Sequence, residues 1–216
     1  MPSRKQAIDL IRKKEMPHHI FRHSMAVRKV AVAVACLLKA KGHAIDVRLV
    51  DRAAMLHDIC KIDSIRNGGD HALMGEHLLR ECGYPMVADV VGQHVRLKSF
   101  QLNEAMVVNY ADKRVKHDRI VSLSERFIDL MNRYGTDDAR QERILKHYLD
   151  VVEIEHSIMS SCDIDDRWLE NLDLIPGDYP LYCCECLLRE NSTVENHDED
   201  IDLEGVYQDE PVLVDK

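Results

Sequence analysis

Apolar residues recur along the first 162 residues at spacings of three and four, the period of an amphipathic helix. Glycine and proline are sparse inside these segments and cluster between them, which predicts successive helices joined by short loops. The predicted helices cover residues 3–14, 18–41, 46–60, 71–82, 85–97, 103–116, 118–134 and 138–162. No segment shows the period-two alternation of a half-buried strand. The predicted fold class is therefore all-α, a compact helical bundle.

The helical pattern ends near Cys162. Pro176, Gly177 and Pro180 then interrupt the apolar period, so residues 163–190 are expected to form an irregular peripheral segment. Residues 191–216 hold nine acidic residues and one lysine, a composition typical of a disordered acidic tail. The predicted organisation is one domain over residues 1–162 with an irregular, acidic C-terminal extension.

The net charge of −9 is unevenly distributed, because residues 1–190 together carry only −1. The first fifty residues contain eleven lysines or arginines against three acids. This surplus suits a phosphate-bearing ligand, although a solvated basic helix face is the simpler interpretation. Nucleic acid is a disfavoured partner, since the basic stretch is short and lacks interleaved aromatic residues for base stacking.

The chain has no segment that predicts membrane insertion or secretion. Its longest apolar run, residues 31–38, is far shorter than the roughly 20 residues of a membrane span. Residues 1–15 lack a signal-peptide core, and seven cysteines do not form a paired secretory framework. A cytoplasmic location is expected. The Cys183–Cys186 cluster has no second ligand pair for a structural zinc site, so reduced thiols without a function are expected there.

Histidine and aspartate occupy positions where the helical period calls for core residues. These positions, on five predicted helices, are His23, His57, His71, His94 and Asp112. One buried histidine is usually an ordinary core residue, but such positions on four helices together favour a shared purpose, and His71 on a fifth meets the same test. An ionised Asp112 in a core is costly unless it is paired or metal-bound, and no lysine or arginine shares its apolar stripe. A metal ion would satisfy the whole set. The other histidines, including His117 and His147, are treated as ordinary polar positions.

In chain order, His23, the doublet His57-Asp58 and Asp112 resemble the H...HD...D signature of the HD superfamily of metal-dependent phosphohydrolases. The separations of 34 and 54 residues fit that signature, and the doublet ends a predicted helix just before Lys61. The resemblance covers about residues 15–130. It implies a helical bundle of the HD-domain type.

The resemblance also implies a ligand set. His23, His57, Asp58 and Asp112 would bind a first metal ion. His71 and His94 resemble the additional histidines of the binuclear branch, in which Asp58 would bridge two ions. The expected cofactor is one or two divalent ions, with Mn, Fe, Co, Ni, Zn or Mg as candidates. The doublet is followed by Ile59-Cys60 where the HDIG subgroup has Ile-Gly, so the substrate of that subgroup is not transferred.

The implied reaction is attack of metal-bound hydroxide on phosphorus, with Asp58 as ligand and as the group that orients the water. Developing phosphoryl charge needs nearby cations. Lys61, one helical turn past His57, is the first candidate, and Arg22 and Arg119 are weaker ones. The alternative for Lys61 is a snorkelling surface lysine, and for the two arginines an ordinary surface position.

The sequence thus predicts a metal-dependent phosphohydrolase that cleaves a phosphoester or phosphoanhydride of a nucleotide or another small phosphorylated metabolite. One alternative is a non-catalytic or regulatory HD-like module that binds a nucleotide or metal. Another is a purely structural helical protein. Specificity is expected from the loops at residues 63–70 and 98–103, and the oligomeric state is not readable from the sequence.

Overall fold

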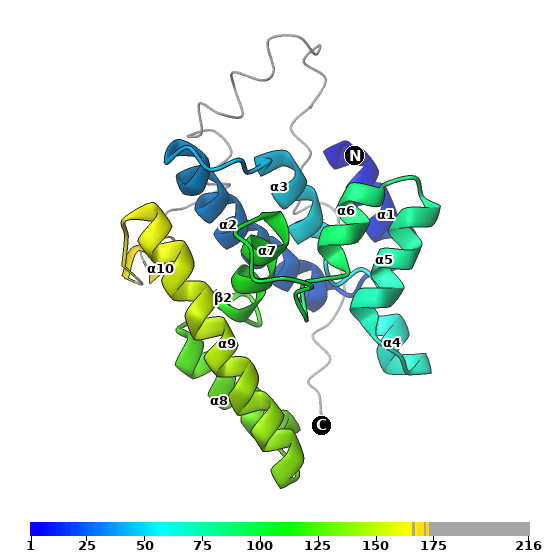
Figure 1. The fold of residues 1–216 in the computed structure, drawn as a ribbon. Coiled ribbons are helices and arrows are strands. Elements are labelled where there is room, and N and C mark those ends of the chain that lie inside the picture. Colours follow the sequence, from blue (N-terminus) through cyan, green and yellow to red (C-terminus); the bar gives the residue numbers. More distant parts are fainter. Residues whose placement is uncertain (166, 171, 173–216) are drawn as a thin grey trace.

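The computed structural model describes residues 1–165, 167–170 and 172. Its described part is built almost entirely of helices, which confirms the all-α prediction (Figure 1). The helices are α1 (Arg4–Lys13), α2 (His18–Ala40), α3 (Val47–Leu56), α4 (Lys61–Asn67), α5 (His71–Glu81), α6 (Pro85–Val91), α7 (Glu104–Lys113), α8 (Leu123–Tyr134), α9 (Asp138–Cys162) and α10 (Arg167–Glu170). A short antiparallel hairpin, β1 (Val115–Lys116) and β2 (Arg119–Ile120), joins α7 to α8.

The core forms around α2, which packs against α3 and α7. Val27, Val30 and Val34 of α2 are fully buried at helical spacing, and burial of each such side chain stabilises the fold by about 1.5–3 kcal/mol. In Figure 1, α1 and α4 to α6 lie on one side of this centre, and α8 and α9 on the other. The predicted amphipathic period therefore places α2 and α7 in the middle of the bundle.

Side-chain caps fix where the helices begin. Asp70 accepts hydrogen bonds from the backbone N–H groups of residues 72 and 73, so α5 begins at His71. Asn103 caps α7 in the same way and sets the register that turns Asp112 inward. Each cap contributes about 1 kcal/mol to helix stability. Two of the predicted ionisable core positions thus depend on a polar residue immediately before a helix.

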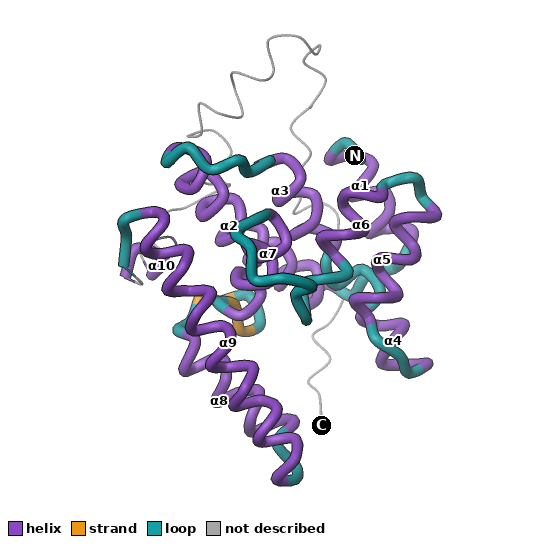
Figure 2. The backbone as a smooth tube through the Cα atoms, in the orientation of Figure 1, coloured by secondary structure: helices purple, strands orange, loops and turns teal. Residues whose placement is uncertain are grey.

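Two predicted helices end earlier than the apolar period suggested. The segment expected at 46–60 ends at Leu56, and residues 57–60 form a turn before α4, which occupies the expected loop at 63–70. The segment expected at 85–97 ends at Val91, because the chain turns at Gly92. Both corrections place the histidines, His57 and His94, in turns that follow helices. The teal segment after α6 in Figure 2 is the long loop that continues to α7.

The hairpin was missed because two-residue strands are too short to give a visible alternation. Its turn consists of His117 and Asp118, and His117 has φ 55°, in the left-handed region. The predicted helix at 118–134 accordingly starts only at Leu123, with Ser122 as its cap.

The C-terminal predictions fall mostly on residues that the structure does not describe. These are the peripheral segment after residue 172, the acidic tail 191–216 and the Cys183–Cys186 cluster. Within the described residues, Cys60, Cys82 and Cys162 are free thiols. Cys36 is disulfide-bonded. No helix among the described residues is long and apolar enough to span a membrane.

Candidate metal centre

The histidines and aspartates singled out above meet between α2, α7 and the turns that follow α3 and α6. The ring centroid of His57 lies 5.4 Å from that of His23 and 5.0 Å from that of His94. The ring of His71, at the start of α5, lies 4.9 Å from His94. Segments distant in sequence therefore bring all the proposed ligands into one cluster.

Backbone carbonyls orient three of the histidine rings. In each ring Nδ1 lies at hydrogen-bond distance from a carbonyl oxygen, which can only accept, so Nδ1 carries the proton. The pairs are His23 with His117 at 2.6 Å, His57 with Ala54 at 2.9 Å, and His94 with Val91 at 2.7 Å. In the neutral form each Nε2 then presents a lone pair to the cluster, the arrangement of a metal-binding histidine held by an outer hydrogen bond.

One half of the cluster is formed by His23, His57, Asp58 and Asp112. Asp112 Oδ1 lies 3.1 Å from His23 Nε2 and 3.8 Å from His57 Nε2, and Asp58 Oδ2 lies 3.6 Å from His57 Nε2. His57 is fully buried and its Nε2 has no hydrogen-bond partner. A buried polar atom without a partner is destabilising, and a divalent cation among these atoms would satisfy it.

The other half is formed by Asp58, His71 and His94. Asp58 Oδ1 lies 3.2 Å from His71 Nε2 and 3.6 Å from His94 Nε2, and the two nitrogens are 3.1 Å apart. In each half, a set of three ligand atoms lies within 4.8 Å of one another. Asp58 contributes one carboxylate oxygen to each set, so it could bridge two ions.

Burial and neighbouring charges keep His57, Asp58 and Asp112 in the forms that bind a cation. At His23, in contrast, burial is outweighed by the hydrogen bond with Asp112 and by the nearby carboxylates, which raise the pKa. Burial lowers the pKa of His57 to about 4, so its ring is neutral at neutral pH. Burial alone would raise the pKa of Asp58, but His57 and the hydrogen bond from His71 hold it well below its usual value. Burial opposes ionisation of Asp112 as well, and there the charge of Lys113 prevails and lowers the pKa. Two carboxylates are therefore ionised beside a neutral imidazole.

Lys113 is a feature that the apolar stripe did not indicate. Its ammonium lies 2.5 Å from Asp112 Oδ2, and the side chain is buried. No lysine or arginine shares the apolar stripe of Asp112, but Lys113, adjacent in sequence, is long enough to fold back over the carboxylate. Asp112 still presents Oδ1 to His23 and His57.

His147 of α9 is the second residue that the sequence reasoning undervalued. It is half-buried, and burial together with the positive charge of Lys113 lowers its pKa to about 4. The charge of Asp112 also acts on it. Its spacing of four and seven residues from the buried Val151 and Ile154 was the available signal that this histidine faces the bundle.

The three predicted substrate-binding cations lie in different surroundings. Lys61 Nζ is 3.5 Å from Asp58 Oδ1 and 3.2 Å from His71 Nε2, so it borders the cluster. Arg22 is exposed and forms an ion pair with Asp118 of the hairpin turn. Arg119 lies exposed on β2. Lys61 is therefore the one of the three that contacts proposed metal ligands.

Asn109 supports the turn that carries His94. Its buried amide group donates to the carbonyl oxygens of His94 at 2.9 Å and Gln93 at 3.3 Å. These two bonds link α7, which carries Asp112, to the turn after α6, which carries His94. They therefore fix the distance between Asp112 and His94.

Comparison with known proteins agrees with this geometry. Residues 20–116 match the family model of the HD domain. This segment is an HD domain. It contains every histidine and aspartate of the cluster and ends within the β-hairpin, so α8 and α9 lie outside the matched HD segment.

Two curated proteins share part of the sequence. An uncharacterized protein of Methanocaldococcus jannaschii is 36% identical over 66 residues, which is 31% of this chain and 38% of that protein. The tRNA (cytidine(56)-2'-O)-methyltransferase of Thermoplasma volcanium is 28% identical over 164 residues, which is 68% of this chain and 46% of that protein. The chain thus spans less than half the length of either relative. No solved structure matches it significantly.

Proposed function

We propose that this protein is a metal-dependent phosphohydrolase that acts on a small phosphorylated substrate, with a nucleotide as the first candidate. The observation that carries the proposal is the fully buried His57 Nε2, which has no hydrogen-bond partner and faces two carboxylates that are ionised despite burial. A structural role for such a group would leave its desolvation uncompensated. A divalent cation removes that cost.

The proposed ligands divide into two sets that share one carboxylate. His23, His57, Asp58 and Asp112 would hold the first ion, and Asp58, His71 and His94 the second. A divalent ion bound there would lower the pKa of a water ligand and polarise a phosphoryl oxygen. Mn, Fe, Co, Ni, Zn and Mg remain the candidates, because imidazole and carboxylate ligands accept all of them in different geometries.

Lys61 is the proposed phosphate-binding cation. Its ammonium lies beside Asp58 and His71, and its side chain is 36% exposed, so it can reach a ligand that enters from solvent. It would stabilise negative charge that develops on the phosphoryl oxygens. Arg22 and Arg119 are proposed as outer cations, although a substrate would compete with Asp118 for Arg22.

The proposed domain organisation is the one predicted from the sequence pattern. Residues 1–162 would form the catalytic domain, residues 163–190 a peripheral segment and residues 191–216 an acidic tail. A cytoplasmic location is also proposed, because the seven cysteines of the sequence, an odd number, do not describe a secreted disulfide framework.

Metal analysis and a substrate panel test the proposal. The purified protein would be assayed for phosphate release or phosphodiester cleavage with Mn, Co, Ni, Mg or Fe, and His57→Ala is the control. The panel would hold nucleoside mono-, di- and triphosphates, cyclic nucleotides, dinucleoside polyphosphates and a phosphorylated tRNA fragment, the last because one relative is a tRNA methyltransferase. Metal-dependent turnover that His57→Ala abolishes supports the proposal. Bound metal without turnover indicates a binding module, and no stoichiometric metal indicates a structural protein.

A further inference from the structure

Helices α8 and α9 form an arm that extends beyond the rest of the bundle (Figures 1 and 2). The second half of α9 packs against the body, since Val151, Ile154 and Ile158 are buried. A cavity of about 270 Å³ opens between the two helices. It is lined by Ser124, Phe127, Ile128, Met131, Ile144, Leu145 and Tyr148.

The arm carries a second apolar face, which points to solvent. Leu145, Leu149 and Val152 of α9 are 54%, 56% and 37% exposed, and their spacing of four and three residues makes them one stripe. Ile128 of α8, 62% exposed, lines the adjoining cavity. A surface helix needs only one apolar face to join a bundle. Among the described residues, this second face of α9 is therefore left uncovered.

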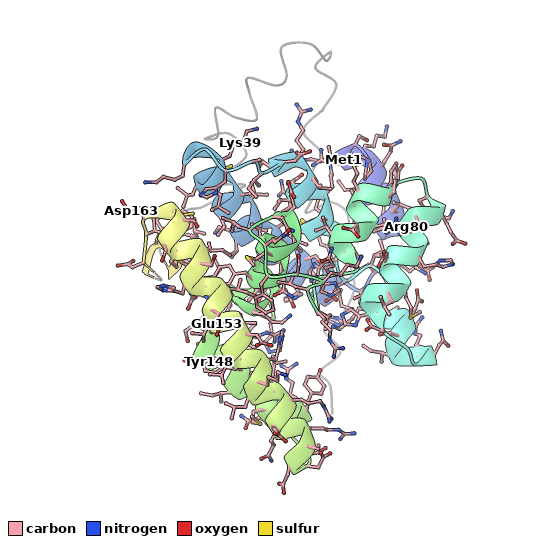
Figure 3. The ribbon with its side chains drawn as sticks, viewed as in Figure 1. Met1, Lys39, Arg80, Tyr148, Glu153 and Asp163 are labelled. Carbon is pink, nitrogen blue, oxygen red and sulfur yellow. The ribbon has the colours of Figure 1, made fainter. Side chains whose placement is uncertain are left out.

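The charges beside the stripe identify the occupant that fits. Lys146 lies three residues before Leu149, and Glu153 lies four residues after it. The two are seven residues apart, so they lie on the same flank of the helix. Both are exposed, and neither forms an ion pair with any residue that the structure describes. Glu153 and Tyr148 are labelled on this part of α9 in Figure 3.

Antiparallel packing of two copies of α9 brings the same flanks together. With a two-fold axis at Leu149, Lys146 of each copy lies near Glu153 of the other, because the two residues are displaced by nearly equal distances to either side of the axis. The stripe is thus self-complementary in both shape and charge. The acidic segment 191–216, with a net charge of −8, has no such match, because this part of α9 carries the acidic Glu142 and Glu153 as well as Lys146.

We propose that the α8–α9 arm is a homodimerisation surface, in which the stripe of Leu145, Leu149 and Val152 packs against the same stripe of a second copy. The two arms then form a four-helix arrangement. Apolar contact supplies the affinity, and the two Lys146–Glu153 pairs set the antiparallel orientation.

The first experiment measures the oligomeric state of the full chain by sedimentation equilibrium. Leu149→Lys introduces two like charges at the two-fold axis. Because Leu149 is exposed in the single chain, the Leu149→Lys variant should fold normally, and the melting temperature of its monomer should equal that of the wild-type monomer. Leu73→Lys is the matched control, since Leu73 is similarly exposed, at 58%, but lies on α5. The wild type and Leu73→Lys are expected to dimerise, and Leu149→Lys to be monomeric. A wild type that stays monomeric, or a dimer that Leu149→Lys leaves intact, overturns the proposal.

The second experiment tests the orientation by charge reversal. Lys146→Glu and Glu153→Lys should each weaken the dimer by about tenfold, since each creates two like-charge contacts. The double variant Lys146→Glu/Glu153→Lys restores opposite charges and should regain most of the affinity. A double variant that is as weak as the sum of the single ones would show that the two residues do not meet, and would overturn the antiparallel arrangement.

Discussion

The β-hairpin makes an unusual contribution to the proposed metal site. His117, at its turn, uses its carbonyl oxygen to accept the Nδ1 proton of His23 at 2.6 Å. The backbone of His117 has φ 55°, which a β-branched residue adopts only with strain. Replacement of His117 by valine should therefore move this carbonyl, whereas His117→Gly should leave it in place.

The expected magnitudes separate metal binding from folding. Loss of an outer hydrogen bond to a metal-binding histidine typically lowers metal affinity by about 10- to 100-fold. The left-handed backbone costs a non-glycine residue roughly 1–2 kcal/mol, and a β-branched one is at the upper end. We expect His117→Val to weaken Mn or Co binding by at least about tenfold, at a loss of stability of no more than about 2 kcal/mol.

The assay is isothermal titration of metal into the metal-free protein, with urea unfolding in parallel. His117→Gly is the control, because it removes the imidazole and its contact with Arg133 while it tolerates the positive φ. Its metal affinity should match that of the wild type. Equal affinities for the valine and glycine variants would refute the idea that the His117 carbonyl orients His23.

Three further predictions concern single side chains. Lys61→Met should lower kcat by about 10²-fold with little change in metal content, and Lys61→Arg should retain more activity; equal loss in both variants would argue against a charge requirement. Arg114→Met should destabilise the fold by about 3 kcal/mol in urea unfolding, because it leaves Glu155 and the Tyr110 hydroxyl without their buried cationic partner. The pKa of His147 is about 4 in the folded protein, below its ordinary value of 6.5. Between pH 6.5 and about pH 4 the unfolded state therefore binds more protons, and the free energy of unfolding decreases as the pH falls through this range. His147→Gln should flatten this slope, and an unchanged slope would count against it.

The sequence predicted which histidines and aspartates lie together in the core, because a buried ionisable group is costly and therefore stands out in an apolar stripe. His23 and Asp112 interrupt apolar stripes on helices that the structure confirms, and their inward direction follows from the helical period alone. His57 was expected to point inward and is fully buried, even though its helix ends at Leu56. Residues 57–60 form a turn that stays in the interior, so the side chains of His57 and Asp58 are both buried.

Features that depend on tertiary contacts could not be predicted in the same way. Lys113 reaches Asp112 by folding back along its own helix, a direction that helical phase does not encode. The hairpin turn contacts α2 through the Arg22–Asp118 ion pair and α8 through Arg133, and such contacts between segments distant in sequence are not visible in its own residues. Residues 115–120 alone provide too little periodicity to indicate a hairpin.

Metal stoichiometry of the wild type and Asp58→Ala tests the central claim most directly. Asp58 contributes an oxygen to both ligand sets, so its loss should affect both ions. The purified proteins would be dialysed against Mn or Co, and bound metal measured by mass spectrometry, with Asp9→Ala as a control on an exposed carboxylate of α1. We expect one or two tightly bound ions per chain in the wild type and in Asp9→Ala, and almost none in Asp58→Ala. A wild type without stoichiometric metal, or an Asp58→Ala variant that binds as much as the wild type, would contradict the account.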